Sequence, residues 1–420
     1  MSFQQGLSGL NATSQHLQVI GNNIANANTF GSKVARAEFS DVYAAALNGA
    51  GANAIGIGTT LGAVAQQFTQ GNIKTTENPM DLAINGAGFF QVTDGNNPVA
   101  FTRNGQFKVD RDGFIVTNGG LRLMGYRADE LGVVQPGQAV ELQLPTAGVR
   151  PAPTTSVSLE MNLDARQGTT LPAGGAMIDY NDAETYNNAT SLTVFDAKGQ
   201  EVALTYYFQK ATTDSWNVYA TANGLTVGGA AGAPQPLTTI DFPFDGSGPT
   251  APLGPVAFDV PASVNAQGAD TLPITGVQLK LDGTTQFGSP FGVTDLRQDG
   301  FSAGLLTAIT VEGNGIITAR YSNGRSRPAG QIEIATFRNP QGLQAVGDNA
   351  WARTFASGDA VAGVPGDGAL GKLQAGALEE SNIDLTGELV SMITAQRTYQ
   401  ANAQTIKTQD QVLQTLLNLR

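Results

Sequence analysis

The chain has 420 residues, of which 41% are hydrophobic and 14% are charged, and its net charge is −12. This length and apolar content are sufficient for two or three folded domains. The acidic balance and the absence of a long apolar stretch argue against nucleic-acid binding and against membrane insertion. The chain has no cysteine and one histidine, His16, which excludes thiolate chemistry and histidine-based triads. We therefore expect no cofactor and no metal site.

The N-terminal segment predicts one long helix over residues 3–27. Leu10, Leu17 and Ile24 belong to a series spaced three and four residues apart, which is typical of a helix that packs against another helix. Residues 1–32 contain no Asp, Glu, Lys or Arg, which is unusual for an exposed helix, and the segment does not resemble a cleavable signal peptide. Asparagine is a poor interior helix residue, so Asn22, Asn23 and Asn26 suggest a specific partner. We expect this helix to be ordered mainly by association.

The middle of the chain alternates apolar and polar residues between Asn-Gly, Asp-Gly and Gly-Gly turns, which predicts β-hairpins. This pattern occurs on both sides of a Pro-rich linker and a Thr/Val/Gly-rich stretch. We therefore predict a discontinuous β domain from 71–145 and 287–377, and an inserted outer β sandwich or barrel from 146–286. Residues 34–70 are compatible with a helix, a loop or a contact arm.

The C-terminal segment predicts a second helix, with Ser381 and Asp384 in capping-box spacing at its start. Its expected seam runs through Leu389, Gln396, Tyr399, Ile406 and Leu413. Uncharged amides such as Asn402 on or beside the seam fix the register, because a misaligned partner leaves them unpaired. The predicted fold class is α+β: two mainly-β domains plus a terminal domain, 1–70 and 378–420, whose helices form an antiparallel coiled coil.

Three motifs raise the possibility of chemistry, and each has a simpler structural reading. The stretch GDGALGK, 366–372, resembles a phosphate-binding loop, but Leu373 replaces the Mg²⁺-binding hydroxyl and no strand precedes it. Asp110 and Asp112 lie at a predicted hairpin turn, where Asp before Gly has a structural explanation. Asp81 is expected to make a local hydrogen bond. We expect no enzymatic activity.

At the level of motifs, the chain resembles the bacterial flagellar rod and hook proteins. The stretches LSGLNATSQHLQVIGNNIANANTFGSK and LEESNIDLTGELVSMITAQRTYQANAQTIKTQDQVLQTLLNLR are similar to the paired terminal signatures of that family. NPMDLAINGAGFF, FTRNGQFKVDRDGF and FRNPQGL are similar to its interior motifs. Signature residues are present at Asn22, Asn23, Asn26, Thr29, Gly31, Gln396, Arg397, Tyr399, Ala401 and Asn402.

The length and the inserted domain are similar to the hook members of the family, whereas distal rod proteins are shorter. The resemblance implies a structural subunit that polymerises into a curved, flexible tube, the universal joint that transmits torque from rod to filament. It implies extracellular location in the hook after export without a cleaved signal peptide. The implied partners are neighbouring hook subunits, the distal rod protein, the hook cap, the hook–filament junction proteins and the flagellar type III export apparatus.

Assembly contacts are expected at sixteen positions of the two terminal segments: Leu10, Leu17, Asn22, Asn23, Ile24, Asn26, Thr29, Gly31, Leu389, Gln396, Arg397, Tyr399, Ala401, Asn402, Ile406 and Leu413. A distal rod or other axial protein is the nearest alternative. A β-rich extracellular adhesin or enzyme is more remote, because it leaves the two helical ends unexplained and no pair of carboxylates is nominated.

Overall fold

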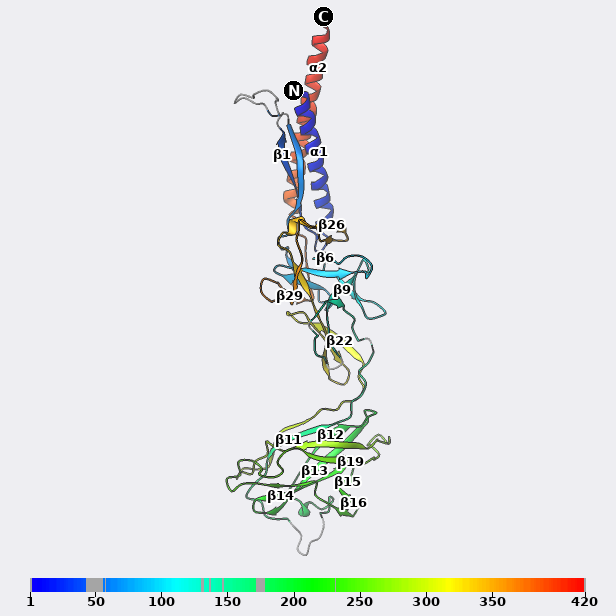
Figure 1. Ribbon diagram of the computed structural model, residues 1–420, viewed down its shortest axis with the longest axis vertical. Helices are drawn as coiled ribbons and strands as arrows, with labels where there is room; N and C mark the ends of the chain where they lie inside the picture. The colour runs from blue at the N-terminus through cyan, green and yellow to red at the C-terminus, as the bar shows by residue number, and fades with distance from the viewer. Residues whose placement is uncertain are drawn as a thin grey trace. The chain divides into compact units, whose positions relative to one another are not determined.

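The computed structural model describes residues 2–42, 56, 58–129, 132–135, 137–145, 147–170, 178–230 and 232–418. The chain divides into two compact units. The first unit contains residues 1–146, 307–320 and 326–420, and the second contains 147–306 and 321–325. The chain is mostly β, with one long helix near each end (Figure 1). No described helix is both long and apolar enough to span a bilayer.

The two helices of the first unit are α1 (Ser2–Asn26) and α2 (Leu385–Asn418). The predicted limits of α1 agree with the structure, but α2 begins later than its predicted cap. Asp384 is the capping residue, because its Oδ1 accepts the Thr386 N–H at 3.1 Å and its backbone oxygen accepts the Glu388 N–H. Ser381 lies before the helix, and its Oγ accepts the Ile383 N–H.

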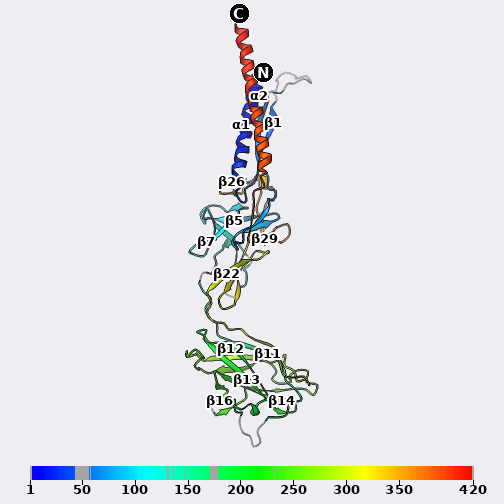
Figure 2. The same cartoon turned by 180° about the vertical axis from the view of Figure 1, so that it is seen from behind.

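The segment for which the sequence left three options forms a β-hairpin. Strands β1 (Ala35–Val42) and β2 (Gly58–Gln66) pair antiparallel and pack against α1, and both views place them beside the helix (Figures 1 and 2). The residues that connect the two strands lie largely outside the described set. His16 packs edge-on against Phe39 of β1, with 5.9 Å between ring centroids.

The β part of the first unit contains a 13-stranded sheet and two small strand pairs. Its main path is β22 (Leu306–Val311), β23 (Ile316–Tyr321), β24 (Ser326–Ile332), β9 (Arg122–Arg127), β5 (Phe89–Thr93), β6 (Ala100–Thr102), β27 (Ala350–Ala352) and β26 (Gln344–Gly347). The side strands are β7 (Phe107–Val109), β8 (Ile115–Thr117), β10 (Val140–Glu141), β25 (Ile334–Thr336) and β28 (Val361–Gly363). The two pairs are β4 (Leu82–Asn85) with β29 (Lys372–Ala375), and β3 (Ile73–Thr75) with β30 (Ala377–Glu379).

Strands from both sides of the second unit's segment contribute to this sheet: β9, β5 and β6 precede that segment in the chain and form the middle of the main path, between β24 and β27. Its core is formed by buried apolar residues such as Phe90, Phe107 and Leu123. The turn between β7 and β8 is held by Asp110, whose Oδ1 accepts the N–H groups of Asp112 and Phe114. Asp110 therefore has the structural role expected of it.

The other two motifs also have structural roles. Asp81 accepts a hydrogen bond from Asn78 at 3.2 Å, so its predicted local bond is confirmed. Residues 366–372 lead into strand β29 rather than into a helix. A phosphate-binding loop delivers its ligand to a helix N-terminus, so this geometry does not provide one.

The second unit contains two sheets that share one hydrophobic core, as in a sandwich. One sheet is β19 (Val256–Val260), β20 (Ile274–Lys280), β11 (Ser156–Asn162) and β21 (Gly292–Gln298). The other is β12 (Asn188–Phe195), β13 (Glu201–Thr212), β14 (Ser215–Ala222), β15 (Leu225–Val227) and β18 (Thr238–Asp241). Short elements are the pair β16 (Gly229–Ala230) and β17 (Ala233–Pro234), and the 3₁₀ turn η1 (Ala183–Thr185); the first unit has η2 (Pro340–Gly342). Neither sheet closes on itself among the described strands, so the barrel option is not observed.

The second unit extends further along the chain than predicted. The expected border at residue 286 is wrong, because β21 hydrogen-bonds antiparallel along β11 and the compact unit continues to Leu306. Asp299 reinforces this pairing, since its carboxylate accepts the backbone N–H groups of Thr155 and Ser156. Sequence periodicity does not show which of two flanking sheets a strand joins.

Candidate assembly interface

The two helices lie side by side and run in opposite directions (Figures 1 and 2). Gly6 and Gly9 near the start of α1 face Ile406 and Asn402 of α2, whereas Asn23 near its end bonds Glu388. A Cβ added at Gly9 would lie 2.9 Å from the Asn402 side-chain nitrogen. The absence of a side chain at these glycines therefore permits a close approach of the helices.

The buried face of α1 is displaced by about one residue from the predicted seam. The residues that α1 buries are mostly small or polar: Gly6, Ala12, Thr13, Ile20 and Asn23. Leu10, Leu17 and Ile24, which were predicted to face α2, are only partly buried. The structure thus uses small residues for the helix pair within the chain and leaves part of the leucine series accessible.

Helix α2 is covered along one narrow face only. Ala395 is 5% exposed, and Met392, Asn402 and Ile406 are partly buried. The predicted seam residue Leu389 is 46% exposed, and its neighbours Leu385, Val390 and Ile393 are exposed as well. Of the other predicted contacts in α2, four have exposed side chains: Gln396, Arg397, Tyr399 and Ala401. Leu413 lies in α2, but its side chain is outside the described residues.

Asn23 joins three elements. Its side-chain nitrogen donates to the Ala35 carbonyl at 2.8 Å and to Glu388 Oε1 at 3.2 Å, and its Oδ1 accepts the Ala35 N–H at 3.0 Å. The Asn23 side chain is nearly fully buried, so its amide cannot exchange these hydrogen bonds for bonds to water. The amide therefore fixes how α1, α2 and β1 fit together.

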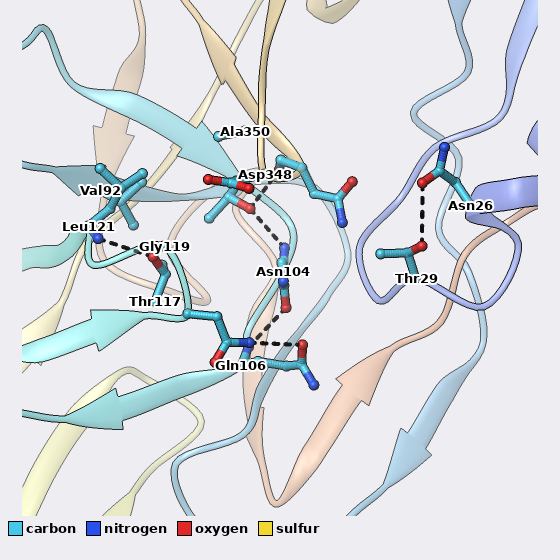
Figure 3. Close-up of a pocket in the computed structure, with 13 residues that line it drawn as sticks. Asn26, Thr29, Val92, Asn104, Gln106, Thr117, Gly119, Leu121, Asp348 and Ala350 are labelled. Atoms are coloured by element: carbon cyan, nitrogen blue, oxygen red, sulfur yellow. Dashed lines mark hydrogen bonds between the residues drawn. The ribbon is translucent and has the colours of Figure 1, made fainter. Parts of the chain in front are cut away.

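Asn22, Asn26 and Thr29 form a separate network at the end of α1. Asn26 Nδ2 donates to the Asn22 carbonyl at 2.9 Å and to Asn22 Oδ1 at 3.0 Å. Thr29 Oγ1 donates to Asn26 Oδ1 at 3.5 Å, the bond drawn in Figure 3. Asn22 is exposed, so its side chain serves helix termination rather than the helix pair.

Gly31 follows this turn and has a backbone geometry that other residues rarely adopt. Its φ is +71°, and a Cβ there would lie 2.5 Å from the Asn104 nitrogen and 2.7 Å from the Arg103 carbonyl carbon. Its N–H donates to the Glu379 carbonyl at 2.9 Å. Glycine is therefore required both by conformation and by space.

A buried charge cluster lies where both helices join the β part. Lys33 Nζ lies 2.5 Å from Glu379 Oε1, and Arg103 Nη1 lies 3.0 Å from Glu379 Oε2. The side chains of Lys33 and Glu379 are fully buried. Lys33 also donates to the Thr69 carbonyl at 2.7 Å, and the Gly71 N–H donates to Glu379 at 2.9 Å. The cluster thus links segments from both ends of the chain.

Burial lowers the pKa of Lys33, and the Glu379 carboxylate opposes that effect. Burial likewise lowers the pKa of Arg103, again opposed by Glu379. The carboxylate thus supplies the compensation that buried cations require. The sequence predictions missed this cluster, because Lys33 and Glu379 are 346 positions apart and nothing in their surroundings nominates them as a pair.

Asn382 completes the connection just before α2. Its Oδ1 accepts the Val34 N–H at 2.8 Å, and its Nδ2 donates to the carbonyls of Gln67 and Thr69. These bonds satisfy backbone groups at the ends of β1 and β2. The base of the hairpin is therefore fastened to the start of α2.

Next to this junction, the end of α1 borders a polar cavity of about 390 Å³. Asn26, Asn104, Gln106 and Asp348 line it from different segments, and Val92 and Leu121 form its apolar side (Figure 3). Across the part of the chain that the structure describes, no three His, Cys, Asp or Glu residues are grouped as a metal site would require.

Family models match four segments of the chain. They are flagella basal body rod protein at 3–33, flagellar hook protein FlgE/F/G D1 domain at 83–161, flagellar basal body protein FlaE D2 domain at 162–301, and flagellar basal body rod FlgEFG protein C-terminal at 374–419. The first and last of these matches contain nearly all of α1 and α2.

Curated relatives are similar over the whole chain. The flagellar hook proteins FlgE of Salmonella typhimurium and Escherichia coli K12 are each 37% identical, with 100% of both chains covered. That of Borreliella burgdorferi is 32% identical over 100% of this chain and 99% of its own. The crystal structure of Helicobacter pylori flagellar hook protein FlgE2 shares the fold, with a TM-score of 0.54 and 15% identity over 73% of this chain and all of that one. The chain belongs to the flagellar hook protein family.

Proposed function

We propose that this chain is the structural subunit of the bacterial flagellar hook, which polymerises into a curved, flexible tube and transmits torque from the rod to the filament. One observation carries the proposal beyond the family relationship: the terminal helices leave apolar side chains uncovered in the single chain. Leu389, Val390 and Ile393 of α2 are 46%, 60% and 53% exposed. Contiguous exposed apolar surface of this kind marks an interaction site.

The occupant of this surface is a neighbouring copy of the same chain. The pair α1–α2 then acts as an antiparallel coiled coil, with residues 1–70 and 378–420 as the helical layer of the polymer. Gln396, Arg397, Tyr399 and Ala401 are exposed and contribute contacts between copies. Asn23, Asn402 and Gly31 act within the chain, where they fix the register of the helices and their junction.

The mechanical role follows from the division into two units. A tube that bends while it turns needs contacts that hold their register and contacts that slide. The helical layer, with its buried amide and its charge cluster, provides the first kind. The second unit, a separate sandwich, provides weaker polar contacts between copies.

The family relationship extends the proposal to location and partners. The subunit is exported by the flagellar type III apparatus and assembles outside the cell beneath the hook cap. It contacts the distal rod protein at one end of the tube and the hook–filament junction proteins at the other. Its role is structural rather than enzymatic.

Electron microscopy of the concentrated protein tests the proposal. The full chain is expected to form tubes or helical filaments, whereas a variant with Leu389→Gln and Ile393→Gln is expected to remain monomeric. The matched control is Leu225→Gln in the second unit, where the side chain is 50% exposed. A variant that assembles as readily as the control contradicts the role given to the apolar face of α2. A full chain that stays monomeric at every concentration and salt condition favours the adhesin.

A further inference from the structure

A phenylalanine of the first unit projects fully into solvent from a tightly held turn. The Phe355 side chain is 104% exposed. The turn around it is fixed by Thr354, whose Oγ1 donates to the Gly342 carbonyl at 2.5 Å and accepts the Ala356 N–H at 3.1 Å. Ser357 Oγ accepts the Thr354 N–H at 3.0 Å, and Asn339 donates to the Ala356 carbonyl.

This arrangement holds an aromatic side chain in place without covering it. Exposed single apolar residues are common, so exposure alone does not mark Phe355 as a contact residue. Here the backbone on both sides of Phe355 is constrained, so little conformational freedom remains to be lost when the ring is bound. The turn has the properties of a preorganised contact residue.

The same unit carries an apolar cavity of a size that suits such a ring. The cavity has a volume of about 390 Å³ and lies beside the polar cavity of Figure 3, with which it shares Val92, Leu121 and Asp348. Pro98, Ala100 and Val346 also line it. Pockets that bind small ligands begin at about 300 Å³, so one aromatic side chain fits within it.

Charges around the two surfaces are complementary. Arg353 and Arg338 have exposed side chains near Phe355, and Arg353 Nη1 lies 2.6 Å from Asp359 Oδ1. The cavity wall carries Asp94 and Asp348. Hydrogen bonds from the backbone and side chain of Asn97 hold the pKa of Asp94 below its usual range, so this carboxylate is ionised at neutral pH. Opposite charges at the rim favour one orientation of the contact.

We propose that Phe355 of one copy inserts into the cavity lined by Leu121 and Val346 of the next copy. The inference rests on the proposed function, because it names a contact within that polymer. The Phe355 side chain and the cavity are different surfaces of one chain, so the contact is heterologous and can repeat from copy to copy. Such an interface extends the polymer rather than closing a pair.

Cysteine cross-linking tests the contact directly, because the natural chain has no cysteine. The double variant Phe355→Cys with Val346→Cys is assembled and then oxidised, and its products are separated under denaturing, non-reducing conditions. The matched control carries Phe244→Cys with Val346→Cys, since Phe244 of the second unit is equally exposed, at 102%. The wild-type polymer, checked by electron microscopy, reports on the proposed function separately.

The expected result is a ladder of cross-linked species beyond the dimer from the 355/346 variant and no ladder from the control. Phe355→Ala is expected to raise the concentration needed for assembly by about tenfold or more, because the contact of one large apolar side chain is lost. Tubes from the wild-type chain, together with no 355–346 cross-link and an unchanged assembly concentration for Phe355→Ala, overturn this inference while leaving the proposed function intact.

Discussion

Lys33 Nζ and Glu379 Oε1 lie 2.5 Å apart, with no part of either side chain accessible to solvent. Lys33 is the first charged residue of the sequence, and Glu379 closes the last strand before α2. The pair therefore connects the two points at which the helical ends leave the β part. A tube under torque loads this junction, so its integrity bears on the whole polymer.

The first prediction concerns the removal of this cation. Lys33→Met is expected to lower the free energy of unfolding of the first unit by about 3–5 kcal/mol, because the variant leaves Glu379 with one of its two buried cations. The protein has two tryptophans, Trp216 in the second unit and Trp351 in the first, so fluorescence of a Trp216→Phe background reports on the first unit alone. Urea unfolding in that background measures the change.

The matched control is Lys74→Met. Lys74 Nζ lies 3.8 Å from Glu380 and its side chain is 64% exposed, so the loss is expected to be below about 1 kcal/mol. Equal unfolding midpoints for Lys33→Met and Lys74→Met would show that the buried pair contributes no more than an exposed one.

A second prediction compares Gly21, within α1, with Gly31, which follows the turn at the end of that helix. Gly31→Ala is expected to destabilise the first unit by at least about 1–2 kcal/mol, because its φ is +71° and a Cβ would contact the backbone of Asn104. Gly21→Ala in α1 is expected to stabilise by roughly 0.5–1 kcal/mol, since no atom lies within 4 Å of the added Cβ. Thermal unfolding of both variants gives the opposite signs directly, and the same sign for both would contradict the geometry.

The helices show how far the sequence leads and where it stops. Periodicity predicted both helices, the lack of charge in residues 1–32 indicated that the first helix packs against a partner, and the turn residues predicted the hairpins. The buried face of α1 lies one residue away from the predicted seam. The periodicity argument places leucines between the helices, whereas Gly6 and Gly9 allow α2 to approach α1 along a neighbouring face. Leu10 and Leu17 are only partly buried within one chain. A sequence does not distinguish a contact within a chain from a contact between copies.

The buried charge cluster of Lys33, Arg103 and Glu379 could not be predicted from the sequence, for a different reason. Burial of Lys33 depends on the fold of strands separated by most of the chain, and charged residues are rarely buried. The border of the second unit was mispredicted for a similar reason. The alternation of apolar and polar residues in β21 is the same whether this strand pairs with β11 or joins the sheet of the first unit. The local sequence pattern predicted the helices and strands, but it did not predict which strands or side chains pair over long distances in the chain.

A third prediction uses the acid–base behaviour of Tyr126. Burial, with the Glu333 carboxylate that accepts its hydroxyl at 2.7 Å, raises the pKa of Tyr126 to about 12. An unfolded tyrosine has a pKa of about 10. Between these two values the folded state binds more protons than the unfolded state, so the contribution to stability is complete below about pH 10 and is lost as pH rises towards 12.

The difference in phenolate absorbance between the wild-type chain and Tyr126→Phe isolates this titration from the other tyrosines. Glu333→Gln is expected to move the transition down towards the ordinary value, because it removes the negative charge next to the hydroxyl. A difference curve centred near pH 10 in the wild-type chain would exclude the proposed role of burial and Glu333.

The last prediction separates two adjacent asparagines of the motif. Asn23→Ala is expected to destabilise the first unit by about 1–3 kcal/mol, because the Ala35 N–H, the Ala35 carbonyl and Glu388 lose a buried partner together. Asn22→Ala is expected to change stability by less than about 0.5 kcal/mol, since the Asn22 side chain is exposed and its carbonyl still accepts the Asn26 amide. A double-mutant cycle of Asn23→Ala with Glu388→Ala then isolates the bond between the helices. Additive losses would place the role of Asn23 entirely in its contact with β1, whereas a coupling energy of about 0.5 kcal/mol or more would show that this amide also holds α2 in register.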